Sequence, residues 1–237
     1  MTMVELIAFD ADDTLWHNEG HYTNAKERFI QILSKYHPPA LIENRLDEIE
    51  IGNIGSYGYG IKSFVLSMIE AAVEISDGLI RGSEIQDILA LGRDMLNADV
   101  HVLDKAEKIL SELAVDFPLM LITKGDPIEQ RRKIIHSGLE KYFRYIEIVG
   151  EKTPDTYRVL FEKYNLQPSQ VLMIGNSLRS DILPVIQIGG RAVYVPYENT
   201  WSHENNVGEM LNNYAYFEIE KLEDLPDLVS SINIKHS

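Results

Sequence analysis

The fold of this chain follows from one stretch near its beginning, Leu6-Ile7-Ala8-Phe9-Asp10-Ala11-Asp12-Asp13-Thr14-Leu15. Its first four residues form an uncharged apolar run, which is typical of a strand buried on both faces of a parallel sheet. Three acids and a hydroxyl follow at once. Carboxylates this close repel one another and resist burial, and a divalent cation with oxygen ligands is the usual compensation. The stretch therefore predicts a buried strand that ends in an acidic ligand site.

The composition is that of an ordinary globular protein. The 237 residues are 45% hydrophobic and 25% charged, which suffices for one domain with an insertion. The net charge of −15 argues against nucleic acid and anionic membranes as partners, but it allows a small anionic substrate where cations converge locally. There is no Cys, and hence no disulfide or thiol nucleophile. With neither a signal peptide nor a membrane-spanning run in the sequence, we expect a cytoplasmic protein.

The segment from about residue 20 to residue 97 predicts helices and no strand. Apolar residues recur at helical spacing and indicate four helices that pack as a small bundle, over residues 23–36, 40–51, 59–76 and 83–96. Four glycines, from Gly52 to Gly60, indicate a flexible turn between the second and third helices. This turn is either a plain connector or a substrate-facing loop in which Tyr57, Tyr59 and Lys62 are candidate contacts.

From about residue 100 onward, helices alternate with short apolar strands. The strands are predicted over residues 118–122, 145–149, 171–174 and 191–195. Strands separated by helices indicate an α/β fold with a doubly wound parallel sheet and right-handed crossovers. Residues 196–217 are polar and aromatic and predict no element, whereas residues 222–232 favour a closing helix.

Polar residues stand where these strands end. Beyond the acids of the first strand, Thr123, Lys152, Asn176 and Asp181 follow later strands. The carboxyl ends of parallel strands share one edge, so these side chains can converge on one crevice. In phosphoryl transfer, one carboxylate can attack phosphorus, a second can protonate the leaving oxygen, and hydroxyl and ammonium groups can hold phosphate oxygens. Lys124 either adds positive potential to this crevice or is solvated.

The stretch Asp10-Ala-Asp12-Asp13-Thr14 resembles the first motif, DxDGT, of the haloacid dehalogenase (HAD) superfamily phosphatases. Thr123, Lys152 and Asp181 match, in order, the three later motifs of that family, so the resemblance spans almost the whole chain. It implies a Rossmann-like core domain and a helical cap domain that closes over the active site. The core is expected over residues 1–16 and 100–237, and the cap over residues 17–99.

The resemblance also implies roles for the site residues. Asp10 is then the nucleophile, which forms an aspartyl-phosphate, and Asp12 is the general acid and base. Thr123 and Lys152 bind phosphate, with Lys124 as a further candidate. The implied cofactor is Mg²⁺, and its implied ligands are Asp10, the Asp12 backbone carbonyl, Asn176 and Asp181.

Two positions depart from the family pattern. Asp13 replaces a glycine, and because Asp adopts positive φ more readily than most residues, we expect the turn to be kept and the side chain to be solvated. Asn176 stands where many relatives have Asp. Its amide oxygen can still bind Mg²⁺, but without the negative charge.

Taken with the resemblance, these features predict a Mg²⁺-dependent phosphomonoesterase that acts on a small phosphorylated metabolite. A 2-haloacid dehalogenase of the same superfamily needs no metal and lacks the second acid, so Asp12 argues against it. A phosphosugar mutase keeps both acids and a cap, and stays open as an alternative. A non-catalytic binding protein on this fold is disfavoured by the intact set of acids, Thr and Lys. The sequence specifies neither the substrate nor the oligomeric state.

Overall fold

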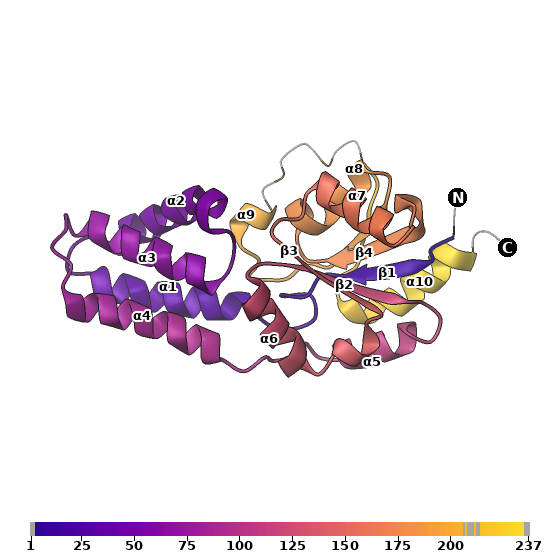
Figure 1. Ribbon diagram of the computed structural model, residues 1–237, viewed down its shortest axis with the longest axis horizontal. Helices are drawn as coiled ribbons and strands as arrows, with labels where there is room; N and C mark the ends of the chain where they lie inside the picture. The colour runs from indigo at the N-terminus through magenta and orange to yellow at the C-terminus, as the bar shows by residue number, and fades with distance from the viewer. Residues whose placement is uncertain (1–2, 206, 208–210, 212–213, 235–237) are drawn as a thin grey trace. The chain divides into compact units, whose positions relative to one another are not determined.

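The computed structural model describes residues 3–205, 207, 211 and 214–234, and the chain divides into two compact units (Figure 1). The sheet unit comprises Met1–Glu19, Val100–Lys124 and Gln130–Ser237. The helical unit comprises Gly20–Asp99 and the short segment Gly125–Glu129. Each unit has a hydrophobic core of its own.

The sheet consists of parallel strands in the order β3-β2-β1-β4-β5-β6. β1 pairs with β2 on one side and β4 on the other, so its carboxyl end opens between theirs. This topology confirms the predicted α/β fold with a doubly wound parallel sheet. The strands are β1 Leu6–Phe9, β2 Leu119–Lys124, β3 Tyr145–Val149, β4 Val171–Gly175, β5 Arg191–Tyr194 and β6 Phe217–Glu218.

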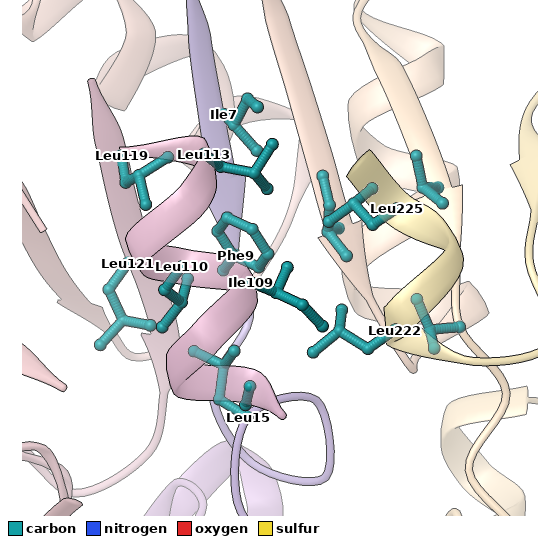
Figure 2. Packing of buried hydrophobic residues seen from close by; sticks show 14 of the residues in the cluster. Ile7, Phe9, Leu15, Ile109, Leu110, Leu113, Leu119, Leu121, Leu222 and Leu225 are labelled. Atoms are coloured by element: carbon teal, nitrogen blue, oxygen red, sulfur yellow. The ribbon is translucent and has the colours of Figure 1, made fainter. Parts of the chain in front are cut away.

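Helices cover both faces of the sheet. They are α5 Ala106–Leu113, α6 Pro127–Ser137, α7 Pro154–Lys163, α8 Leu183–Gln187 and α10 Leu225–Ile234, and the short helix α9 Ser202–Asn205 follows β5 in the chain. Successive residues of β1 point to opposite faces. Ile7 and Phe9 pack in the core that α5 and α10 cover (Figure 2), whereas Leu6 and Ala8 pack in the core beneath α7 and α8. Burial on both faces explains why this strand carries no charge.

Of the elements that follow β5, the sequence predicts only the last helix. Residues 196–217, for which no element is predicted, contain α9 and the first residue of β6, and part of this stretch lies outside the described residues. The predicted closing helix is present as α10, displaced by a few residues.

The helical unit contains the four predicted helices, with shifted boundaries. They are α1 Glu19–Leu33, α2 Pro39–Tyr57, α3 Ile61–Ile75 and α4 Gly82–Asn97. Their apolar faces form one core around Phe29, Phe64 and Met68. A Cβ at Gly92 of α4 would overlap Val65 of α3, so the glycine allows these two helices to approach closely. In the described part of the chain, no helix is both long and apolar enough to cross a membrane.

The predicted flexible turn over residues 52–60 is wrong for most of its length. α2 continues to Tyr57, and only residues 58–60 connect it to α3. A glycine inside a helix costs about 0.5–1 kcal/mol relative to alanine, which packing against a neighbouring helix readily offsets. Here the Asn53 side chain donates to Glu70 Oε2 on α3 at 2.7 Å and fastens the last turns of α2.

The helical course of α2 predicts the effect of Gly52→Ala. A Cβ at this position meets no atom within 4 Å, so we expect the variant to gain about 0.5–1 kcal/mol of stability from its higher helix propensity. Gly92→Ala is the contrasting control, because its Cβ overlaps Val65; overpacking should cost about 1–3 kcal/mol. Chemical denaturation measures both. A destabilising effect of Gly52→Ala would show that this stretch is not helical in solution.

Candidate active site

Three charged side chains from three strand ends meet at the carboxyl edge of the sheet. Asp10 follows β1, and Lys152 follows β3. Asp181 lies in η3 (Leu178–Ile182), a π-helical turn after β4. Lys152 Nζ lies 2.5 Å from Asp10 Oδ1 and 2.7 Å from Asp181 Oδ1, and all three residues are buried. The structure thus brings together three residues that were predicted from separate motifs.

This buried triad has two acids for one base. Burial alone would lower the pKa of Lys152, but the charges of Asp10 and Asp181 outweigh it and raise that pKa well above its usual value. Burial, together with the charge of Asp10, raises the pKa of Asp181 to about 7. The Lys152 ammonium group therefore stays charged at neutral pH, and its positive charge offsets the repulsion between the two acidic side chains.

Asp181 fits this position because the last residue of β4 is a glycine. One carboxylate oxygen faces Lys152, and the other accepts a hydrogen bond from the Ser177 backbone N–H at 3.0 Å. A Cβ at Gly175 would overlap the Asp181 carboxylate. A larger residue at position 175 would therefore displace the acid from Lys152.

Oxygen atoms converge on the other side of Asp10. Thr14 Oγ1 lies 3.1 Å from Asp10 Oδ2 and 3.2 Å from Asn176 Oδ1. In this orientation the Asn176 amide oxygen also faces Asp10 Oδ2 and the Asp12 carbonyl; with the amide turned over, its nitrogen donates to them at 3.3 and 3.2 Å. With the Asn176 amide oxygen facing Asp10, the oxygens of Asp10, the Asp12 carbonyl and Asn176 could together bind a cation. The other orientation suits the same residues without a cation.

These donors fit Mg²⁺, which prefers oxygen ligands and usually keeps several waters. They are the Asp10 carboxylate, the Asp12 backbone carbonyl and the Asn176 amide. Within the described residues, no group of three or more His, Asp or Glu side chains is placed to hold a metal ion. Both oxygens of Asp181 already have partners, in Lys152 and the Ser177 N–H. Its part in metal binding stays a prediction.

The Asp12 carboxylate has a separate set of donors. Lys133 Nζ lies 2.6 and 2.8 Å from its two oxygens, Gln130 Nε2 donates at 2.9 Å, and Trp16 Nε1 donates at 2.6 Å. Burial would raise the pKa of Asp12, but the charge of Lys133 and the hydrogen bonds from Lys133, Gln130 and Trp16 together lower it. Neither Gln130 nor Lys133 is predicted from the sequence. The one available signal is their spacing of three residues, which places both on one face of the helix after Thr123.

Thr123 and Lys124, at the end of β2, have different surroundings. Thr123 is buried, and its hydroxyl donates to Gln130 Oε1 at 3.2 Å. Lys124 Nζ donates to Ser180 Oγ at 2.8 Å and forms an ion pair with Glu204 of α9. The alternative that Lys124 is solvated is wrong, because these partners enclose it and leave only 17% of its side chain exposed.

Glu204 joins α9 to the loop that follows β4. Besides pairing with Lys124, its carboxylate accepts hydrogen bonds from the hydroxyls of Ser177 and Ser180, at 2.5 and 2.6 Å. Burial would raise the pKa of Glu204, but the charge of Lys124 and these hydrogen bonds lower it to about 2. Glu204 belongs to the stretch that predicts no element, so nothing in the sequence pattern places it here.

Asp13 keeps the predicted turn but not the predicted solvation. Its φ of 62° lies in the left-handed region, as expected for a residue in a glycine position. The side chain is buried, and Oδ1 accepts from the backbone N–H groups of Asn18 and Glu19 at 2.8 and 3.1 Å. Solvation fails because the start of α1 leaves N–H groups that need an acceptor. Burial, with the charges of Asp12 and Asp10, raises the pKa of Asp13 to about 7.

The two predicted substrate-contacting tyrosines belong to the helical unit. Tyr57 is the last residue of α2 and is half-exposed, and Tyr59 lies in the connection to α3. Their contact with a substrate stays a prediction.

The sheet unit therefore combines groups that act together in group transfer. Asp10 is a carboxylate held between an ammonium and a hydroxyl, and it lies where parallel α/β sheets bind ligands. The second acid, Asp12, is held independently by its own donors. Such a set can supply a nucleophile, a proton donor and acceptor, and binding groups for an oxyanion.

This chain matches a protein-family model and is similar to several known proteins. A model described as haloacid dehalogenase-like hydrolase matches residues 4–189. The crystal structure of a haloacid dehalogenase-like family hydrolase from Xanthomonas campestris resembles this one with a TM-score of 0.87 and 36% sequence identity, over 98% of this chain and 93% of that one.

Two enzymes are similar to this chain over almost their whole length. Human N-acylneuraminate-9-phosphatase is 23% identical, over 100% of this chain and 98% of that enzyme. Glyceraldehyde 3-phosphate phosphatase of Pyrococcus abyssi is 25% identical, over 98% of this chain and 96% of that enzyme.

Proposed function

Because this chain belongs to the haloacid dehalogenase-like hydrolase family, as its motifs predict, we propose that it is a Mg²⁺-dependent phosphatase of small phosphorylated metabolites. The observation that carries the proposal is the position of Asp10, a buried carboxylate between Lys152 and the Thr14 hydroxyl at the ligand-binding edge of the sheet. The two enzymes similar over almost their whole length support it, since both are named as phosphatases of small phosphorylated metabolites.

The proposed reaction has two steps. In the first, Asp10 attacks phosphorus and forms an aspartyl-phosphate while the bond to the leaving alcohol breaks, and Asp12, in its protonated form, donates that proton to the leaving oxygen and becomes the carboxylate. Lys152 and Thr123 bind the non-bridging phosphate oxygens. In the second, Asp12 accepts a proton from water, which attacks the aspartyl-phosphate. Inorganic phosphate leaves, and the Asp10 carboxylate is restored.

The proposed metal ligands are Asp10, the Asp12 carbonyl and Asn176, with Asp181 acting directly or through a water. The closeness of the Asn176 amide group to Asp10 Oδ2 and the Asp12 carbonyl oxygen, at 3.3 and 3.2 Å, supports this assignment. Bound there, Mg²⁺ would supply positive charge that offsets the repulsion between Asp10 and the phosphate.

Other activities on this fold have less support. A 2-haloacid dehalogenase has no use for a second acid, whereas here three side chains donate to the Asp12 carboxylate. A phosphosugar mutase uses the same acids, and the reaction product distinguishes it, since a mutase yields an isomeric phosphate ester and no net inorganic phosphate.

We further propose that residues 17–99 act as a cap domain, and that Tyr57 and Tyr59 contact the substrate. Two features support this role for the tyrosines. Tyr57 presents a half-exposed aromatic ring at the end of α2. Tyr59 is flanked by Gly58 and Gly60, both with positive φ, so this connection has a backbone shape that other residues rarely adopt.

Asp10→Asn should abolish phosphatase activity, because an amide cannot replace the carboxylate as nucleophile. We expect release of inorganic phosphate from 4-nitrophenyl phosphate and from a metabolite-phosphate panel to fall at least about a thousandfold, with circular dichroism unchanged. Asp10→Ala controls for slow deamidation of the asparagine. Halide release from 2-chloropropionate, assayed in parallel with wild type, tests the dehalogenase alternative. Full activity in both variants would contradict the assignment of Asp10.

Asn176→Asp should lower the Mg²⁺ concentration needed for half-maximal activity, because it adds a negative charge to the group of converging oxygens. Each tenfold gain corresponds to about 1.4 kcal/mol of binding free energy, and calorimetric titration with Mg²⁺ measures it without turnover. Asp181→Ala should raise the concentration sharply. Asn165→Asp adds the same charge at an exposed position and is the control. An unchanged midpoint in Asn176→Asp would place this residue outside the metal site.

Tyr57→Ala and Tyr59→Ala should change selectivity among metabolite phosphates while sparing 4-nitrophenyl phosphate, which offers little beyond the phosphate to recognise. We expect ratios of kcat/KM between substrates to shift by about tenfold, the value of one well-placed contact. Tyr214→Ala, which removes an exposed tyrosine from the sheet unit, is the control. Equal losses on every substrate would favour the connector interpretation of this turn.

A further inference from the structure

Gln130 connects two residues of the proposed mechanism. It is only 2% exposed, and both ends of its amide are used. Nε2 donates to Asp12 Oδ2 at 2.9 Å, and Oε1 accepts from Thr123 Oγ1 at 3.2 Å. While Asp12 is ionised, its carboxylate only accepts hydrogen bonds, so the nitrogen faces Asp12 and the oxygen is left for the hydroxyl. The orientation of the amide is therefore fixed, and Gln130 links the Thr123 side chain to the second acid through its two hydrogen bonds.

Lys133 lies three residues further on α6, on the same face of the helix as Gln130. Its ammonium group contacts both oxygens of Asp12, at 2.6 and 2.8 Å, and donates to Asn18 Oδ1 at 3.1 Å. The Lys133 side chain is 15% exposed and that of Asp12 is 22% exposed, so water competes little for this pair. Contact with both oxygens limits rotation of the carboxylate as well as its displacement.

We propose that Gln130 and Lys133 are positioning residues, which hold the Asp12 carboxylate at the leaving oxygen of a phosphate ester bound by Thr123. This inference rests on the proposed function, in which Asp12 is the proton donor. Proton transfer depends steeply on placement, because a shift of about 1 Å in a reacting group can cost about a hundredfold in rate. If the pair had only a structural role, replacing either residue would slow the hydrolysis of all substrates alike. If the pair positions Asp12, replacing either residue would slow most strongly the hydrolysis of esters whose leaving group needs a proton.

Two substrates of similar size separate these cases. 4-Nitrophenolate leaves readily without a proton, whereas the alkoxide of benzyl alcohol is a poor leaving group and needs one. The measured quantity is kcat/KM, which reports the steps up to cleavage of the ester bond. Because loss of Lys133 also raises the pKa of Asp12, each variant is compared at the pH of its own maximal kcat/KM. There we expect Lys133→Met and Gln130→Met to lose about 10–100 times more kcat/KM on benzyl phosphate than on 4-nitrophenyl phosphate. Asp12→Asn should show at least the same discrimination, and Lys133→Arg should recover most of the loss.

Arg131→Met is the matched control. It removes a cation from the same helix and breaks an ion pair of 2.7 Å with Glu140, but touches neither Asp12 nor Thr123. We expect it to leave the ratio of the two kcat/KM values unchanged. Thermal unfolding of each variant checks the fold, and where Lys133→Met does not fold, Lys133→Gln and Gln130→Asn carry the same comparison.

The outcomes separate this inference from the function on which it rests. Equal losses on both esters in the Lys133 and Gln130 variants, with discrimination retained in Asp12→Asn, would overturn the positioning role and leave the phosphatase mechanism intact. Absence of discrimination in Asp12→Asn would instead overturn the role of Asp12 as proton donor. A wild-type enzyme that hydrolyses neither ester nor any metabolite phosphate would contradict the proposed function as a whole.

Discussion

The site depends on one buried ammonium group held between two carboxylates. Without Lys152, Asp10 and Asp181 would face each other with little water between them, and removing one partner from a buried ion pair costs about 3–5 kcal/mol. The three residues reach this point from β1, from the loop after β3 and through η3. Charge therefore fixes the ends of these chain segments relative to one another, in addition to the backbone hydrogen bonds of the sheet.

The fold and this central triad could be predicted because the signals are local. Asp10, Lys152 and Asp181 each follow an apolar strand, and parallel strands separated by helices must end on one edge. The partners of the second acid could not be predicted in this way. Gln130 and Lys133 look like ordinary polar residues of a surface helix, and only the packing of α6 against the end of β1 shows where they point.

Other expectations fail where tertiary contacts outweigh local preference. The glycines within residues 52–57 favour a turn, yet hydrogen bonds from Asn53 to α3 keep this stretch helical. Glu204 comes from a stretch without periodicity, and its place is set by a cation at the end of another strand and two serines after β4. Long-range charge pairing of this kind leaves no trace in the spacing of residues along a chain.

The conformation of Asp13 has a mechanical consequence. A glycine at this position would give the backbone its left-handed turn and nothing more, whereas the aspartate also binds the N–H groups of Asn18 and Glu19. The acidic loop is thereby closed on itself and tied to the first residue of α1. The loop that carries Asp10 and Asp12 is therefore fixed to the start of α1 by side-chain hydrogen bonds as well as by the covalent backbone, which limits how far the two carboxylates can move apart from that helix end.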